Sequence, residues 1–277
     1  MKLIGIIKDA FLFPSKHTGR FAIYLLLSVL VAGFAIGGII TYGLGLFDSV
    51  NYLTGGMYLI ISMIIACLIS GYHVKVIKSG IELSDEVPVF KLYEDFMTGF
   101  NNILVLIGYF IIPAIIVIIV AFDTNLFDNL IYIVLEFVKQ IFNVYIMGNS
   151  ADLAVNAISH TVENFMGSLA ITIAVASILF VIFTILESIG EARLANTGSV
   201  RQALNIFETM KDIRKIGLGR TILLILLILI VISIIEIILI TLFQYYPFLL
   251  SIIYIIITPY MALVTRRSVG LLYSDIA

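Results

Sequence analysis

Six long apolar runs constrain this chain more than any other feature, because each is long enough to cross a lipid bilayer. They lie at about residues 21–46, 52–77, 102–122, 165–187, 220–243 and 247–265. About 20 apolar residues in a helix cover the roughly 30 Å of hydrocarbon in a bilayer. The chain is 61% hydrophobic and only 12% charged, which is outside the usual range of soluble domains. The sequence therefore predicts an all-α integral membrane protein, a single membrane domain with six transmembrane helices.

The basic residues indicate the orientation of these helices. If the N-terminus is cytoplasmic, every Lys and Arg except Lys139 lies on the cytoplasmic side. Basic residues concentrate in the cytoplasmic segments of membrane proteins. We therefore expect a multi-pass protein of the cell membrane with both termini in the cytoplasm. The basic edges of the spans also predict contact with anionic lipid headgroups at the cytoplasmic face.

A further apolar stretch, Leu126 to Met147, is long enough to span but is amphipathic. A seventh span here would place the basic block from Arg193 to Arg220 outside the cell, against the charge rule. The stretch therefore predicts a helix that lies in the membrane interface. After the break at Gly148-Asn149-Ser150, a second amphipathic stretch between Asp152 and Glu163 predicts an outer helical hairpin. This hairpin either gates the protein as a lid or only covers apolar surface.

A repeated pattern divides the chain into three units. Amphipathic stretches at Met1–Phe13, Pro88–Phe100 and Ser199–Ile216 each precede a span that runs outward, and each returning span ends in basic residues. The predicted units, each an interfacial helix followed by a helical hairpin, are 1–80, 81–195 and 196–277, with the outer hairpin as an insertion at 123–164 in the second. Such repeats occur in transporters, where substrates bind between them, and also in inert scaffolds.

Away from the span ends, Glu236 is the only Asp, Glu, Lys or Arg inside the six predicted spans. A charged side chain there costs on the order of 3 kcal/mol on insertion scales, so an acid within a span is by default a candidate site. Ser233, Thr241 and Gln244 lie on the same side of its helix and predict a polar stripe, and Ser251 and Tyr254 of the next span are candidate partners at the same depth. A carboxyl that binds and releases a proton is what a proton-coupled carrier needs. A protonated Glu236 that hydrogen-bonds a neighbouring helix, with a purely structural role, explains the stripe equally well.

Small residues and prolines indicate how the spans pack. Gly33 and Gly37, beside Gly38, form a pattern that lets another helix approach closely. Pro113 and Pro259 lie within spans, where each removes a backbone donor and favours a kink.

No enzyme signature is present, and no motif indicates a metal or another cofactor. Nucleic-acid binding has no support, because the basic residues are spread along the membrane edges. We expect no enzymatic activity.

Several short motifs resemble an uncharacterised family of multi-pass membrane proteins, found largely in archaea, that carries only a domain-of-unknown-function label. The similar positions are Gly71-Tyr72 with Lys75, Pro88-Val89-Phe90, Gly99, Tyr109 with Pro113, the loop from Ala192 to Ser199, and Gly270 with Tyr273. The resemblance covers nearly the whole chain, although the region 123–164 is longer than it leads us to expect. It supports the topology and implies no catalytic or binding residue.

Two functions remain. The favoured one is a non-enzymatic membrane organiser that binds lipid or other membrane proteins, because the strongest sequence signals concern membrane placement. The alternative is a proton-coupled carrier of a small solute or ion that uses Glu236. The partners indicated are the bilayer, other membrane proteins or further copies of the chain.

Overall fold

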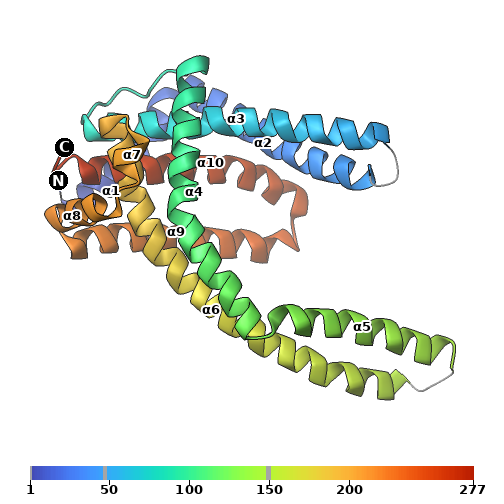
Figure 1. Cartoon of the computed structure of the whole chain (residues 1–277). Helices are drawn as coiled ribbons and strands as arrows, with labels where there is room; N and C mark the ends of the chain where they lie inside the picture. The colour runs from blue at the N-terminus through green and yellow to red at the C-terminus, as the bar shows by residue number, and fades with distance from the viewer. Residues whose placement is uncertain (1, 46–48, 148–150) are drawn as a thin grey trace. The chain divides into compact units, whose positions relative to one another are not determined.

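The computed structural model describes residues 2–45, 49–147 and 151–277, and every regular element in them is helical (Figure 1). The elements are α1 (Leu3–Leu12), the 3-10 helix η1 (Phe13–His17), α2 (Thr18–Leu44), α3 (Ser49–Ile81), α4 (Leu92–Asp123), α5 (Leu126–Tyr145), α6 (Ala151–Thr197), α7 (Val200–Ala203), α8 (Ile206–Ile216), α9 (Leu218–Phe243) and α10 (Pro247–Tyr273).

Six of the described helical segments are long and apolar enough to cross a membrane, as the sequence predicts. They are Leu3–Leu44, Val50–Ile81, Leu92–Asp123, Val162–Thr197, Leu218–Phe243 and Pro247–Tyr273. Several are longer than the apolar runs. The 33 residues of α3 extend about 50 Å, and the 47 residues of α6 about 70 Å, at 1.5 Å per residue. Since the hydrocarbon is only about 30 Å thick, these helices carry turns that extend beyond it.

The chain divides into two compact units. Unit 1 comprises Met1–Ile107 and Ile185–Ala277, and unit 2 comprises Gly108–Thr184. Unit 1 thus contains the start of α4 and the end of α6, together with both ends of the chain. The division into three repeat units stays a prediction.

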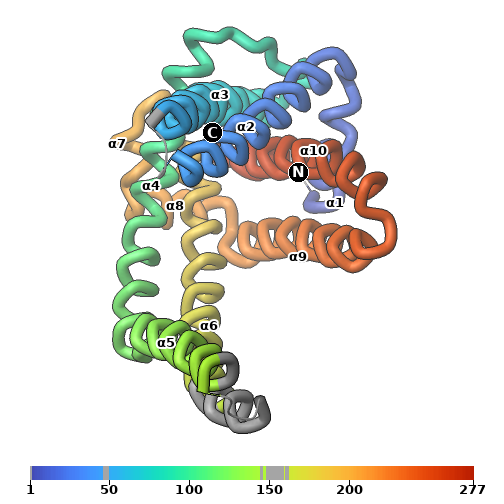
Figure 2. The backbone as a smooth tube through the Cα atoms, turned by 90° about the vertical axis from the view of Figure 1, so that its right-hand side faces the viewer, coloured from blue at the N-terminus to red at the C-terminus, as the bar shows by residue number. Residues whose placement is uncertain are grey.

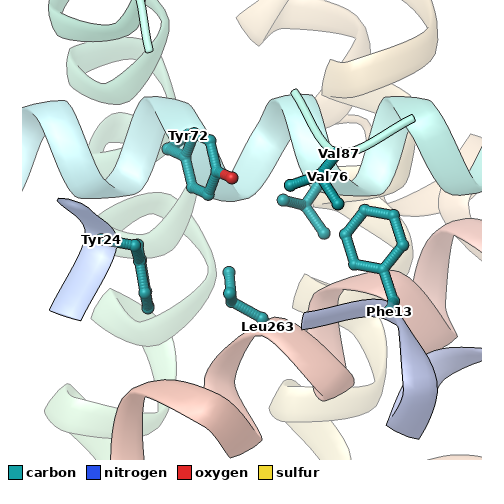
Figure 3. Close-up of a cluster of buried hydrophobic side chains, with 6 residues drawn as sticks. All are labelled: Phe13, Tyr24, Tyr72, Val76, Val87 and Leu263. Atoms are coloured by element: carbon teal, nitrogen blue, oxygen red, sulfur yellow. The ribbon is translucent and has the colours of Figure 1, made fainter. Parts of the chain in front are cut away.

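Unit 1 is organised around α3, which lies beside α2 and α10 in both views (Figures 1 and 2). Aromatic and aliphatic side chains fill the space between these helices near η1: Phe13, Tyr24, Tyr72, Val76, Val87 and Leu263 (Figure 3). All six are at least 97% buried. Phe90, from the segment that precedes α4, stacks on Tyr72 with ring centroids 3.9 Å apart. This cluster joins the beginning of the chain to its last helix.

Glycines allow the closest helix approaches in unit 1. A Cβ at Gly71 would meet the backbone oxygen of Asp95, and a Cβ at Gly99 would meet that of Cys67, so α3 and α4 cross there in backbone contact. Gly80 and Gly270 do the same for α3 and α10.

The predicted packing residues have different surroundings. Gly38 lies directly against Leu59, and Gly37 lies 3.8 Å from Tyr58, measured from an added Cβ, whereas such a Cβ at Gly33 meets nothing within 4 Å. Pro113 lies inside α4 and Pro259 inside α10, and both helices continue through the proline.

Polar contacts, in addition to contacts between aromatic rings, hold the helices of unit 2 together. The Thr124 hydroxyl lies 3.4 Å from that of Thr172, and Asn129 Nδ2 donates to Ser168 Oγ at 2.9 Å. The predicted helix from Leu126 to Met147 corresponds to α5. The predicted break at 148–150 lies outside the described residues, and the second amphipathic stretch forms the beginning of α6, continuous with the span.

Candidate functional site

Paired acidic and basic side chains collect at the end of unit 1 where α1, α8 and the last turns of α10 meet. We call this set the charge layer, and its members are Asp9, Lys16, Lys75, Asp85, Asp95, Glu187, Glu191, Arg193, Asp212, Arg220, Arg266, Arg267 and Asp275. Their helices come from both ends of the sequence. The charge layer therefore connects helices whose contact cannot be predicted from hydropathy alone.

Arg267 is the most buried cation of the charge layer, at 1% exposed. Its Nε donates to Asp9 Oδ1 at 2.9 Å, and its Nη1 donates to Ser79 Oγ at 3.2 Å and to the Ser84 backbone oxygen at 2.8 Å. Its guanidinium carbon lies 4.5 Å from the centre of the Phe13 ring. One side chain of α10 thus binds α1, α3 and the loop after α3.

Lys75 and Lys16 pair with acids of the α3–α4 region. Lys75 forms a close ion pair with Asp95, a carboxylate with no exposed side-chain surface. The Lys16 ammonium lies 2.5 Å from Asp85 Oδ1 and 3.5 Å from Asp9 Oδ2. The hydrogen bond and charge of Lys16 hold the pKa of the Asp85 carboxyl below its ordinary value.

Asp212 is the carboxylate through which α8 contacts its neighbouring helices. It pairs closely with Arg193 of α6 and accepts a hydrogen bond from the Tyr273 hydroxyl at 2.9 Å. Ser199 precedes α7 and makes no side-chain cap contact. Asn205 caps α8 by accepting from the Glu208 backbone N–H.

Glu187 and Glu191 lie one turn apart on α6 and face Arg266 of α10. The Arg266 guanidinium contacts Glu191 closely and lies 3.9 Å from Glu187 Oε1. Asn102 of α4 joins them, because its Nδ2 donates to Glu191 Oε1 at 2.8 Å. This acidic centre consists of Glu187, Glu191, Asn102 and Arg266.

Glu236, the residue singled out by the sequence, lies in a groove between α9 and α10. The groove has a volume of about 500 Å³ and includes Glu236, Ser251 and Tyr254 in its lining, which is mostly apolar. A second hollow of about 210 Å³ adjoins the same carboxyl, with Tyr254 and Thr258 in its lining. The structure thus places three of the predicted residues around one groove.

The remaining residues of the predicted stripe do not join that groove. Ser233, Thr241 and Gln244 are exposed, and the Thr241 hydroxyl donates to the backbone oxygen of Ile237 in its own helix. Ser251, although in the lining, donates to the Pro247 oxygen of its own helix at 2.7 Å. The hydroxyls of Thr241 and Ser251 thus form hydrogen bonds within their own helices.

The charge layer corrects one interpretation of the sequence. Glu236 is not the only ionisable side chain within the spanning helices, because α6 carries the buried Glu187 and Glu191.

One signal in the sequence points to the missed acids. Glu187 and Glu191 are spaced by four residues at the end of a span, so a single helix face carries both. Their partner Arg266, however, lies 75 residues beyond Glu191, and no pattern in the sequence pairs them.

No metal centre is formed within residues 2–45, 49–147 and 151–277, since no three His, Cys, Asp or Glu side chains are grouped to hold an ion. The six apolar helices define the class as a multi-pass helical membrane protein. Residues 54–244 match the family described as "Protein of unknown function (DUF4013)", and because the match covers most of the chain, the protein belongs to this family. The comparison with curated proteins found no match, and neither did the comparison with solved structures.

Proposed function

We propose that this protein is a non-enzymatic membrane organiser that binds anionic lipid headgroups with the basic end of unit 1. The orientation that supports this role places both termini in the cytoplasm of a cell, following the distribution of Lys and Arg along the chain. In this arrangement the charge layer joins the hairpins at the cytoplasmic face.

The observation that supports the proposal is a set of exposed basic side chains that form no ion pair in the charge layer. Lys8 of α1, Arg201 of α7 and Arg214 of α8 are exposed, and none forms an ion pair with another described residue. Large apolar side chains are exposed on the same short helices: Ile4 at 82% and Phe207 at 80%. Basic and apolar side chains together on a short helix are typical of helices that lie in the headgroup region.

The size of the effect follows from the charge. Each Lys or Arg close to an anionic membrane surface contributes about 1 kcal/mol. Neutralising three of them should therefore weaken the preference for anionic lipid by about 3 kcal/mol, on the order of 100-fold. The rest of the protein stays folded, because these side chains form no internal pairs.

The test is lipid selectivity, measured by native mass spectrometry or with spin-labelled lipids in mixed anionic and zwitterionic bilayers. The triple variant K8Q/R201Q/R214Q should lose the preference for anionic lipid. The matched control K78Q/K91Q/K139Q removes the same charge from lysines that pair within their own segments, and it should keep the preference. Equal selectivity of wild type and triple variant would refute the proposal.

A second candidate, a proton-coupled carrier, is favoured by one observation: the groove at Glu236 holds a carboxyl, a hydroxyl and a phenol within an apolar lining. An apolar carbodiimide should modify Glu236, and a transported solute should protect it. Absence of labelling at any pH, with a folded Glu236→Gln variant, would exclude this role.

A further inference from the structure

The acidic centre on α6 holds one more negative charge than its cations neutralise. Glu187 is 4% exposed and Glu191 is fully buried. Among the residues that the structure describes, Arg266 is the only cation within 4 Å of either carboxylate. Two carboxylates and one guanidinium leave a net charge of −1. An uncompensated buried charge is strongly unfavourable, so this arrangement requires a further positive species.

The neighbouring helices do not supply it. His73 of α3 shares a 2.7 Å hydrogen bond with the Tyr24 hydroxyl of α2. Lys75 of α3 is already paired with Asp95 of α4. The group that α4 contributes directly is Asn102, which is neutral.

The hydrogen bonds of Asn102 show that the acidic centre lacks a donor. Its Nδ2 donates to Ser70 Oγ at 3.0 Å and to Glu191 Oε1 at 2.8 Å. Because a carboxylate only accepts, these bonds fix the orientation of the amide. Its Oδ1 is then a buried acceptor without a donor, and Glu187 Oε1 also has no hydrogen-bond partner. A buried acceptor left without a donor costs about 1–3 kcal/mol.

We infer that Glu187 binds a proton in the folded protein, which makes the acidic centre a proton-binding site separate from Glu236. The proton comes from water, and the only bond formed is the O–H on Glu187. This bond removes the excess negative charge and adds a donor to a centre in which Asn102 Oδ1 lacks one. Arg266 then pairs with Glu191 alone, in agreement with its closer contact to that residue.

The test is the pH dependence of unfolding between pH 6 and 9 in mixed detergent micelles at constant sodium concentration. A free glutamate titrates near pH 4.3, so the unfolded chain releases the proton throughout this range. For one proton held only in the folded state, the unfolding equilibrium constant rises about tenfold per pH unit while Glu187 stays protonated. Glu187→Gln should remove this slope, since the amide keeps a donor without a titrating proton.

The matched control is Glu236→Gln, which changes the same functional group at the groove and should keep the wild-type slope. Infrared spectroscopy gives a second readout: a protonated-carboxyl band at pH 8 in wild type and Glu236→Gln that is absent in Glu187→Gln. Should Glu187→Gln fail to fold, the band in Glu236→Gln decides. Equal slopes in wild type and Glu187→Gln, or no carboxyl band at pH 8, would overturn the inference, and so would a stability that rises with sodium in a second series at constant pH.

Discussion

Removing the charge of Arg267 is the sharpest perturbation of the charge layer. The substitution Arg267→Met keeps a long side chain at a site that is 1% exposed. It deletes the hydrogen bonds to Asp9, Ser79 and the Ser84 backbone oxygen. The contact with the Phe13 ring stays as an apolar contact. The variant therefore isolates the loss of charge and donors from the loss of volume.

The expected loss of stability follows from the partners that Arg267→Met leaves unpaired. Removing one partner of a buried ion pair costs about 3–5 kcal/mol, because the other charge remains uncompensated. The cost of leaving Asp9 without Arg267 should lie at the lower end of this range, because the Asp9 side chain is 25% exposed and Lys16 remains 3.5 Å away. Ser79 is 6% exposed and cannot regain water. We therefore expect a loss of about 3 kcal/mol.

The assay is reversible unfolding by an added anionic detergent, followed by circular dichroism. The matched control is Arg214→Met, which removes an exposed arginine without an ion pair and should change the stability by about 0.5 kcal/mol or less. A loss below about 1 kcal/mol for Arg267→Met would show that the charge layer does not stabilise the fold.

Three further predictions use the same unfolding assay. Gly99→Ala should cost about 1–3 kcal/mol because the added methyl meets backbone, whereas Gly56→Ala, which meets nothing within 4 Å, should be neutral or slightly stabilising; equal effects would contradict the helix crossing. Tyr273→Phe should cost about 1.5–3 kcal/mol through the lost hydrogen bond to Asp212, and an unchanged stability would refute that contact. The lowered pKa of Asp85 means that its ion pair stabilises the fold above the unfolded pKa of about 3.9 and is lost as the pH falls through the lower folded value. Wild type and Asp85→Asn should therefore differ at pH 6 and converge once the pH falls below the folded pKa of Asp85, and a constant difference would contradict the assignment.

The spans and the family could be predicted from the sequence because both depend on local patterns. Length and hydropathy identify six spans, the charge distribution and the amphipathic pattern exclude Leu126–Met147, and the described part of the structure has the corresponding six helices. The family resemblance is confirmed by the match over residues 54–244. Hydropathy does not mark where a helix ends, however. The second outer stretch and the fourth span, which hydropathy separates, form one continuous helix, because no proline interrupts Ala151–Thr197.

The charge layer could not be predicted because its pairs are distant in sequence. Asp9 and Arg267 are separated by 258 positions, and Asn102 and Glu191 by 89. Each residue alone resembles an ordinary charged residue at a membrane edge. Only the packing of α1, α3 and α10 brings the partners together and buries them, so the interpretation centred on Glu236 left out this part of the protein.

The proposed binding of anionic lipid requires that the charge layer lies at the cytoplasmic face, with both chain ends on the same side of the membrane. Labelling of single added cysteines with a membrane-impermeant maleimide tests this directly, and the native Cys67 is buried at 4% exposed and so gives a low background. Lys8→Cys and Ser274→Cys should react only after the membrane is permeabilised, whereas Lys139→Cys should react in intact cells. Labelling of either chain end in intact cells, or of Lys139→Cys only after permeabilisation, would contradict the account.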